Sequence, residues 1–509
     1  MQVHPPRERY IQQAEPTAGM RPVWCEMLGD GETPVAAFAR LRSHGATGML
    51  ESVIGGERWA RYSFIVVGAR ARVVGHWRDN AMQLELRPGE GFDAPPSLRR
   101  GEGLAALRRI FEHYRAQPQH DQPPLWGGIV GAWGHDLVRC FERLPQPHHH
   151  APSPVPGLDL IVTDTLVVFD NLRQRVRVVT AVHPTDDGPA GVAYDAARQR
   201  LDRVCQALQQ APPALPALAL HEDEPFEAHV APPWSSENFM ASVQTAQRYV
   251  VAGDIFQVVL AQGFEAPRDG LDPLALYRIL RVTNPAPYMY LLGLHGATLV
   301  GASPEVLVRL DRDSRQVTLR PIAGTIRRGR DEAEDLALEQ QLLADPKERA
   351  EHLMLIDLGR NDVGRVSVGG TVRMRERFAI ERYSRVMHIV SEVVGTLLPD
   401  LDALDVLHAT FPPGTLSGAP KVRALQIIDE LEPAARGWYG GAVGYVGFDG
   451  GADFSICIRS ALVLDDRIRV QAGGGIVYDS VPQAEDQESR NKAAAVLRAI
   501  AMAKAGRHP

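Results

Sequence analysis

Two patterns of hydrophobic and polar positions alternate along the first 210 residues. Residues 61–68, 127–135 and 158–170 are short runs of β-branched and aromatic side chains bounded by turn-forming residues, which is typical of strands. Residues 192–210 repeat their apolar side chains every three or four positions, as an amphipathic helix does. The first 210 residues are therefore predicted to form a lobe that mixes strands and helices.

The pattern changes at residues 211–235, where proline and acidic residues are frequent and no period is visible. This composition predicts a linker. Ser235 then provides a helix N-cap, and residues 240–252 carry apolar side chains at helical spacing. We therefore expect a first lobe of residues 1–210, a linker of residues 211–235 and a second domain of residues 236–509.

The second domain mixes the same two patterns. Strands are predicted at residues 256–262, 297–303, 440–448 and 468–477, and helices at residues 345–358 and 484–503. A chain of 509 residues is too long for one ordinary core, so two domains or two large packed lobes are expected.

Composition excludes several classes of function. The formal net charge is −7, whereas nucleic-acid-binding domains usually carry a concentrated basic excess, so no nucleic-acid partner is expected. No apolar run reaches the roughly 18 residues of a membrane span, and the N-terminus is polar, so no membrane attachment is expected. The cysteines, Cys25, Cys140, Cys205 and Cys457, lack the spacing of a disulfide framework, which favours a reduced cytoplasm.

Two predicted helices carry pairs of glutamates. Asp345 and the proline after it are good N-terminal residues, so Glu348 and Glu351 lie on one face of the helix that begins there. Glu485 and Glu488 lie three apart near the start of the last helix. Each pair alone is typical of a solvated helix face. Together the four carboxylates would suit Mg²⁺, which prefers oxygen ligands and also binds oxygens of an anionic substrate.

Other segments offer groups that bind anions. The glycines of residues 473–475 let backbone N–H groups approach a ligand closely. Residues 414–421, GTLSGAPK, lead into a helix whose N-terminus favours anions, but they lack the spacing of a nucleotide-binding loop, so nucleotide hydrolysis is rejected.

Four single residues each have two interpretations. Arg459 is predicted to lie on a strand in an apolar context, where it either forms a buried ion pair or binds a substrate carboxylate. Tyr439 either packs or donates its hydroxyl to the same carboxylate. His388 is either a satisfied core histidine or a catalyst. Glu305, in a loop after a strand, either faces a cleft or caps the next turn.

A series of segments in the second domain carries a specific resemblance. Read in order, they are DIFQVVLAQ, NPAPYM, ASPEVLVR, PIAGTIRRG, KERAEHLMLIDLGRND, VMHIVSEVVGTL, TFPPGTLSGAPK, GAVGY, CIRSA, AGGGIV and SVPQAEDQESRNKA. These segments resemble the chorismate-utilising enzymes. In the first lobe, MLES, RYSFI and GGIVGAWGHDLVRCFE resemble the N-terminal part of the anthranilate synthase branch of that family.

The resemblance implies an α+β fold, a layered α/β sandwich with two intimately packed lobes, in which the second lobe binds chorismate and Mg²⁺. It implies Glu351 and Glu488 as direct metal ligands, with Glu348 and Glu485 as ligands or water-bridged neighbours. The implied catalytic residues are Glu305, His388 and Thr415. The implied substrate-binding residues are Gly324, Thr325, Tyr439, Arg459, Gly473, Gly474, Gly475 and Lys492.

Two positions indicate the branch of the family. Members that add water to chorismate carry a lysine base where this sequence has Gln257, and aminodeoxychorismate synthases resemble PIKGT where this sequence has Ala323. The resemblance therefore implies the reaction of chorismate with ammonia to give anthranilate and pyruvate, with Glu305 as general acid and His388 assisting the elimination. An aminodeoxychorismate synthase and a catalytically silent scaffold are the alternatives.

The resemblance also implies two partners. None of the four cysteines lies in the glycine-flanked turn that a glutamine-hydrolysing nucleophile needs, so ammonia is expected from a separate glutamine amidotransferase subunit. Glu51 and Ser52, together with Pro287, Tyr288 and Met289, resemble the tryptophan-binding regulatory site of the family. Without that resemblance, the two segments are simply the end of a strand and a proline-stiffened turn.

Overall fold

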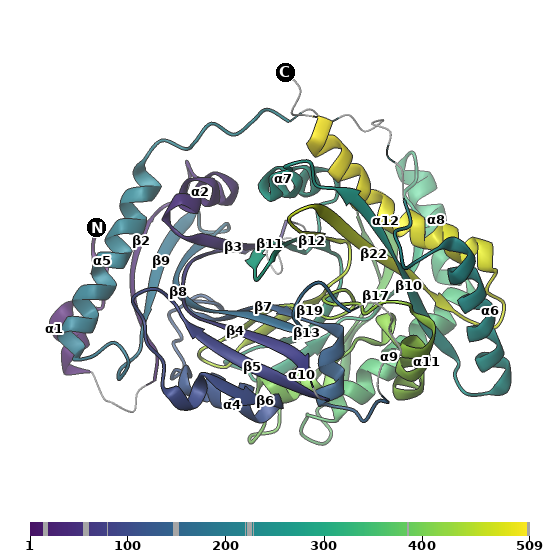
Figure 1. The fold of residues 1–509 in the computed structure, drawn as a ribbon, viewed down its shortest axis with the longest axis horizontal. Helices are drawn as coiled ribbons and strands as arrows, with labels where there is room; N and C mark the ends of the chain where they lie inside the picture. The colour runs from purple at the N-terminus through teal and green to yellow at the C-terminus, as the bar shows by residue number, and fades with distance from the viewer. Residues whose placement is uncertain are drawn as a thin grey trace.

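The computed structural model describes residues 1–13, 19–53, 61–78, 80–145, 152–218, 220, 226, 229–383 and 386–505. The strands in these residues are hydrogen-bonded into one system of 22 strands, and helices pack around its outside (Figure 1). This mixture of helices and strands confirms the predicted α+β class. No helix in the described residues is long and apolar enough to cross a membrane.

The first half of the chain forms a strongly twisted, mainly antiparallel set of strands with helices at its edge. The strands are β1 (Val3–His4), β2 (Arg21–Leu28), β3 (Ala46–Glu51), β4 (Tyr62–Arg78), β5 (Ala81–Pro88), β6 (Arg100–Glu102), β7 (Gly128–Trp133), β8 (Leu158–Asp170) and β9 (Arg175–Val182). The helices are α1 (Arg7–Gln12), α2 (Pro34–Leu41), α4 (Gly103–His113) and α5 (Ala190–Gln209), with short 3-10 helices η1 (Arg42–His44), η2 (Pro96–Leu98) and η3 (His135–Cys140).

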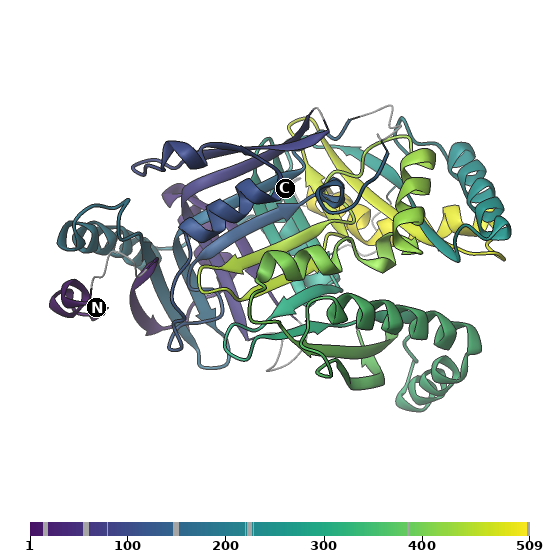
Figure 2. The same cartoon turned by 90° about the horizontal axis from the view of Figure 1, so that it is seen from below.

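The second half adds the remaining strands and most of the helices. The strands are β10 (Gln257–Pro267), β11 (Tyr288–Leu294), β12 (Ala297–Ser303), β13 (Val306–Leu310), β14 (Gln316–Leu319), β15 (Ile322–Arg327), β16 (Arg373–Arg382), β17 (Val386–Thr396), β18 (Gly418–Ala419), β19 (Ala442–Gly447), β20 (Ala452–Ile456), β21 (Ser460–Val463) and β22 (Arg467–Ile476). The helices are α6 (Ser236–Ala252), α7 (Pro273–Thr283), α8 (Glu332–Ala344), α9 (Pro346–Gly364), α10 (Ala403–Thr410), η4 (Gly414–Leu416), α11 (Lys421–Leu431) and α12 (Pro482–Ala505). Helices α8 and α9 lie on one side of β15 and β17 and project from the body of the molecule (Figure 2).

The elements predicted from the pattern are confirmed, apart from the strand that was predicted to carry Arg459. Strand β8 and strand β12 have the predicted bounds, whereas α9 continues beyond its predicted end to Gly364. Nearly all of β8 is buried, as expected for a strand covered on both faces. Ser235 is the N-cap of α6, because its hydroxyl accepts a hydrogen bond from the N–H of Asn238 at 3.1 Å.

Strands from the two sides of the predicted linker pair directly with one another. Strand β7 pairs with β19, and β3 pairs with β11. One buried cluster contains Trp133 and Leu160 from the first half with Val258 and Phe454 from the second. The two halves therefore share a core, and their boundaries at residues 210 and 236 stay a prediction.

Candidate active site

The first two turns of α9 carry two of the glutamates, Glu348 and Glu351. Asp345 caps this helix, since its Oδ1 accepts hydrogen bonds from the N–H groups of Lys347 at 2.8 Å and Glu348 at 3.1 Å. Glu348 packs towards β15, because a Cβ placed on Gly324 would lie 3.2 Å from its Oε2. Burial and the neighbouring charges of Glu351, Asp345 and Glu488 raise the pKa of Glu348.

Helix α12 directs its own charged residues towards the glycines of β22. A Cβ on Gly474 would lie 2.9 Å from Glu485 Oε2 and 3.6 Å from Glu488 Oε1. Lys492 Nζ lies 2.6 Å from Glu488 Oε1 and donates a hydrogen bond to the carbonyl of Gly473 at 3.0 Å. Glu488 and Lys492, four positions apart on α12, therefore form an ion pair that lies against a glycine-lined strand rather than on an isolated solvated face.

Glu485 carries a buried carboxylate oxygen, Oε2, without a hydrogen-bond partner in the described residues. Burial raises the pKa of Glu485. No three of the four glutamates offer oxygen atoms that all lie within 4.8 Å of one another. Mg²⁺ usually keeps several water ligands and also binds substrate oxygens, so the four carboxylates need not all contact the ion directly. The unpartnered oxygen of Glu485 and the presence of oxygen donors alone therefore fit this cation.

Glycines 473–475 reach their positions through the pairing of β22 with β10. Gly473 lies opposite Ala261, and Gly475 lies opposite Val259. A Cβ on Gly473 would lie 2.1 Å from the carbonyl oxygen of Leu260, and one on Gly475 would lie 2.1 Å from Gln257 Nε2. Glycine is therefore required for strand packing at 473, whereas at 474 the nearest atoms are the ends of two glutamate side chains.

Glu305 lies in the short turn between β12 and β13, as its position after a strand predicted. Its Oε1 accepts a hydrogen bond from the hydroxyl of Thr415 at 3.0 Å. Burial raises the pKa of Glu305 to about 7, although Thr415, Lys492 and Arg459 act in the opposite direction. At neutral pH this carboxyl is therefore present in both protonation states, as a proton donor in catalysis requires.

Arg459 does not lie on a strand, and that prediction was wrong. It occupies the turn between β20 and β21 with a φ of 52°, a backbone conformation that an apolar sequence pattern does not reveal. Its Nη1 donates to the carbonyl of Lys492 at 2.7 Å, and no carboxylate in the described ranges lies within ion-pairing distance. Burial lowers the pKa of Arg459, although the charges of Tyr439, Glu305 and Glu488 act in the opposite direction. This guanidinium can therefore accept an anionic partner.

Tyr439 is buried, and His388 is partly buried. Burial raises the pKa of Tyr439 to about 12, which keeps its hydroxyl protonated as a donor. His388 on β17 faces Thr325 on β15, and its Nδ1 lies 3.0 Å from both the carbonyl of Gly324 and Oγ1 of Thr325. A proton on Nδ1 satisfies that carbonyl and leaves Nε2 with the lone pair. Burial lowers the pKa of His388, so the neutral imidazole is favoured.

Arg436 is a supporting residue that the sequence pattern did not identify. Its fully buried guanidinium donates to the carbonyl of Leu416 at 2.6 Å and to the carbonyl of Val259 at 2.8 Å, and it pairs with Glu432 at 2.5 Å. It also lies over the ring of Tyr439, 5.8 Å from the ring centre. Arg436 therefore ties the loop that carries Thr415 to β10, although nothing in its local sequence separates it from a surface arginine.

The proposed regulatory segments are brought together by strand pairing. Glu51 ends β3 and lies opposite Met289 on β11, and both line a cavity of about 360 Å³ with Ser52, Pro287 and Tyr288. The Glu51 carboxylate accepts hydrogen bonds from the Tyr277 hydroxyl at 2.5 Å and from Arg281 at 3.1 Å. The alternative interpretation, a strand end and a turn, also holds in part. Glu51 does end β3, and Pro287 does lead into β11.

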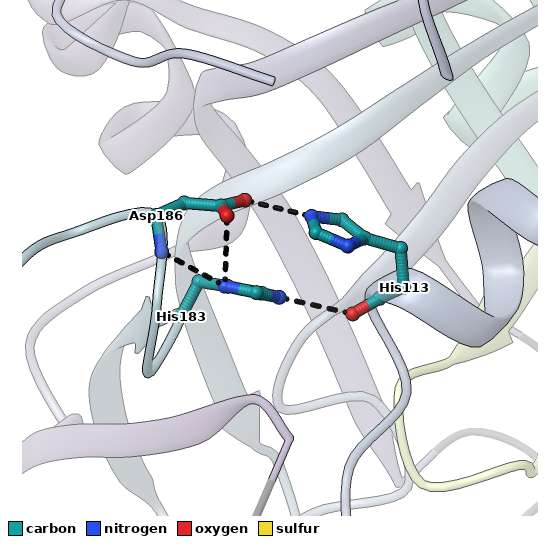
Figure 3. Close-up of side chains that lie close together, drawn as sticks. All are labelled: His113, His183 and Asp186. Atoms are coloured by element: carbon teal, nitrogen blue, oxygen red, sulfur yellow. Dashed lines mark hydrogen bonds and ion pairs between the residues drawn. The ribbon is translucent and has the colours of Figure 1, made fainter. Parts of the chain in front are cut away.

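A separate cluster in the first lobe resembles a metal site in composition. Asp186 lies 2.7 Å from His113 Nε2 and 3.3 Å from His183 Nδ1 (Figure 3). However, His183 Nδ1 already accepts a hydrogen bond from the Asp186 N–H at 3.2 Å, and its Nε2 faces the carbonyl of His113 at 3.0 Å. The two rings are stacked 4.3 Å apart, so their in-plane lone pairs run side by side rather than towards one ion. This cluster is structural.

A family model described as chorismate binding enzyme matches residues 76–498. The chain belongs to this family. It is 43% identical over 506 residues to anthranilate synthase component 1 of Acinetobacter calcoaceticus, a match that covers 96% of this chain and 97% of the relative. The resemblance to the anthranilate synthase branch is therefore confirmed.

Solved structures agree with this assignment. Anthranilate synthase component I from Streptococcus pneumoniae superposes with a TM-score of 0.70 at 33% identity, covering 92% of this chain and 99% of that chain. The menaquinone-specific isochorismate synthase MenF from Escherichia coli superposes with a TM-score of 0.69 at 20% identity, covering 97% of each chain. Because the sequence identity to MenF is only 20%, this structural similarity confirms the fold and says nothing about the reaction.

Two neighbouring glycines of this family member give a test of the site. Gly474→Ala places a methyl group against the ends of Glu485 and Glu488, so we expect chorismate turnover to fall at least tenfold while the melting temperature changes little. Gly473→Ala collides with the backbone of β10, and overpacking of this kind costs about 1–3 kcal/mol of unfolding free energy. Thermal unfolding and chorismate consumption measure both effects. Full activity in Gly474→Ala would show that this face of β22 is not part of the site.

Proposed function

We propose that this chain acts in the cytoplasm and converts chorismate and ammonia to anthranilate and pyruvate, the first committed step of tryptophan biosynthesis. The observation that carries this function is Glu305, a carboxyl with a pKa of about 7 held by Thr415 next to Arg459 and Lys492, in a chain whose relatives are anthranilate synthases. A proton donor beside cations suits a reaction in which an anionic substrate loses a hydroxyl group.

The chain's own groups bind the substrate on two sides. Arg459, which has no carboxylate partner among the described residues, receives a carboxylate of chorismate, and Tyr439 donates its hydroxyl to the same group. The N–H groups around Gly474 approach the substrate where no side chain intervenes. Gly324, next to Glu348, and Thr325, next to His388, border the site on β15.

Glu351 and Glu488, with Glu348 and Glu485, would hold Mg²⁺ in the site. When bound, this ion acts as a template and Lewis acid for the ring carboxylate. Its positive charge also offsets the repulsion between the four glutamates.

Two residues move protons in this proposal. Ammonia attacks C2 of chorismate while the hydroxyl at C4 leaves, and the protonated Glu305 donates a proton to that hydroxyl so that it departs as water. The neutral Nε2 of His388 then assists the elimination of pyruvate, which makes the ring aromatic. The Thr415 hydroxyl orients the Glu305 carboxyl throughout.

Two positions separate this reaction from its relatives in the family. Gln257 packs on Gly475 at the position where the water-adding members carry a lysine, so no amine is available there to activate water. Ala323 on β15 offers no amine either, which argues against an aminodeoxychorismate synthase. The complete set of site residues argues against a silent scaffold. Pyruvate release would distinguish the proposed reaction from that of an aminodeoxychorismate synthase, which retains the pyruvyl group.

A separate glutamine amidotransferase subunit supplies the ammonia in this proposal. A thiol nucleophile is usually an activated thiolate with a lowered pKa. Burial instead raises the pKa of Cys140 to about 11 and that of Cys457 to about 12. Cys25 and Cys205 are buried against each other.

The isolated chain tests this division of labour. With chorismate, Mg²⁺ and an ammonium salt we expect equal amounts of anthranilate, followed by fluorescence, and pyruvate, followed by a coupled enzyme. With glutamine in place of ammonium we expect neither product, because the chain has no suitable nucleophile. Glutamine-dependent product from the pure chain, or chorismate consumption without pyruvate, would contradict the proposal.

Single changes at the metal ligands test the magnesium site. Glu351→Gln and Glu488→Gln each remove one negative ligand, so we expect turnover to fall by a factor of 100 or more and the Mg²⁺ requirement to rise, with the fold retained. Glu237→Gln, in an exposed helical turn of α6, is the matched control and should behave as wild type. Near-wild-type turnover of either ligand variant at saturating Mg²⁺ would disprove the assignment.

The pH dependence tests Glu305. A general acid works in its protonated form, so turnover corrected for free ammonia should decline as pH rises through about 7. The Thr415 hydrogen bond lowers the pKa of Glu305, so Thr415→Val should move that decline to higher pH, whereas Thr415→Ser keeps the hydroxyl and should leave it unchanged. Glu305→Gln should reduce turnover roughly 10²–10⁴-fold. An unchanged pH profile in Thr415→Val would exclude Glu305 as the titrating acid.

Tryptophan feedback inhibition is the proposed role of the cavity beside Glu51 and Ser52. Its volume of about 360 Å³ lies in the range of small-molecule sites, and it joins β3 to β11. Ser52→Phe should fill it and relieve inhibition without loss of turnover. If tryptophan weakens the binding of chorismate by some factor, saturating chorismate must weaken the binding of tryptophan by the same factor. Calorimetry measures both affinities. Undiminished inhibition of Ser52→Phe would disprove the site.

A further inference from the structure

Two cysteines of the first lobe lie in direct contact although they are far apart in the sequence. Cys25 Sγ on β2 and Cys205 Sγ on α5 are 3.3 Å apart, although the two residues are 180 positions apart in the sequence. Cys25 is 0% exposed and Cys205 is 5% exposed. Sequence spacing did not suggest this pair, because only the packing of α5 against β2 and β9 brings the two thiols together.

We propose that Cys25 and Cys205 are a redox modification site, where a small hydroperoxide converts the two thiols reversibly into a disulfide. The sulfur atoms need to approach by only about 1.2 Å, since a disulfide bond is about 2.05 Å long. Both residues lie within regular elements whose side chains share one buried cluster with Val178 and Leu201, so the bond forms between positions that the fold already holds together.

The hydrogen bond between the thiols sets the order of the chemistry. Either thiol can donate this hydrogen bond. The contact lowers the pKa of Cys25 and raises the pKa of Cys205, so Cys25 is favoured as the thiolate and Cys205 as its S–H donor. The Cys25 sulfur therefore attacks the peroxide first, breaking the O–O bond to give a sulfenic acid and an alcohol, or water when the peroxide is H₂O₂. The Cys205 sulfur then attacks Cys25 and releases water. Two thiols lose two protons and two electrons, and the peroxide oxygen atoms take them up.

The remaining two cysteines lack such a partner. Within the described residues, Cys140 makes no sulfur contact, and Cys457 contacts the hydroxyl groups of Tyr290 and Ser460 at 3.9 and 4.0 Å. Oxidation of either one cannot stop at an intramolecular disulfide without large movement. The Cys25–Cys205 bond would also close a loop around most of the first lobe, which restrains the unfolded chain and stabilises the oxidised protein.

The test treats the folded full-length chain with H₂O₂, alkylates the free thiols and maps its peptides without reductant. We expect a Cys25–Cys205 cross-linked peptide that dithiothreitol removes, and a melting temperature that rises by roughly 5 °C and returns on reduction. Cys140→Ser is the matched control and should behave in the same way. Cys205→Ser should give no cross-link and no thermal shift.

Two results would overturn the proposal. One is a cross-link that forms only after unfolding in urea, because the native contact would then play no part. The other is irreversible oxidation of Cys25 to the sulfinic acid in the wild-type protein while Cys205 stays reduced, because the second thiol would then have failed to capture the sulfenic acid.

Discussion

Repulsion between carboxylates is the constraint that the second domain has to satisfy. Helices α9 and α12 each contribute two glutamates, and burial with like-charged neighbours raises the pKa of both Glu348 and Glu485. The surrounding strands hold these acids in place despite that cost, because α12 packs on β22 and α9 packs on β15 and β17. A divalent cation lowers the energy of the same arrangement, so the fold and the ion stabilise each other.

Two cations lie beside these acids, and one of them, Arg459, has no carboxylate within ion-pairing distance among the described residues. Arg459 is partly buried and donates to a backbone carbonyl, and Lys492 is shared between Glu488 and the carbonyl of Gly473. Glu305 lies near both cations, yet burial still raises its pKa to about 7. The guanidinium of Arg459 can bind a negatively charged group of a substrate, because no carboxylate of the described residues pairs with it. The Glu305 carboxyl lies beside it as a proton donor.

Local patterns predicted the elements of the fold but not their pairing. Strand β8, strand β12 and the start of α9 were predictable because alternation, caps and proline act within a few residues. Arg459 was misplaced because its positive φ depends on the turn between β20 and β21. Arg436 was missed because its partners, the carbonyls of Val259 and Leu416, come from distant segments. The glutamates became interpretable as one site only through the resemblance to a family, since each pair alone is ordinary on a helix surface.

The strand order also explains how a ligand in the first cavity could act on Glu305. Tyr288 begins β11 and lies opposite Ser303, which ends β12 two residues before Glu305. Its hydroxyl donates to Asp453 at 2.7 Å on β20, and the last residue of that strand, Ile456, donates its N–H to the carbonyl of Glu305 at 3.0 Å. A ligand that displaces Tyr288 therefore acts on both strands that fix the backbone of Glu305. Since the Thr415 bond to Glu305 spans only 3.0 Å, a small shift of that backbone changes both the position and the pKa of the acid.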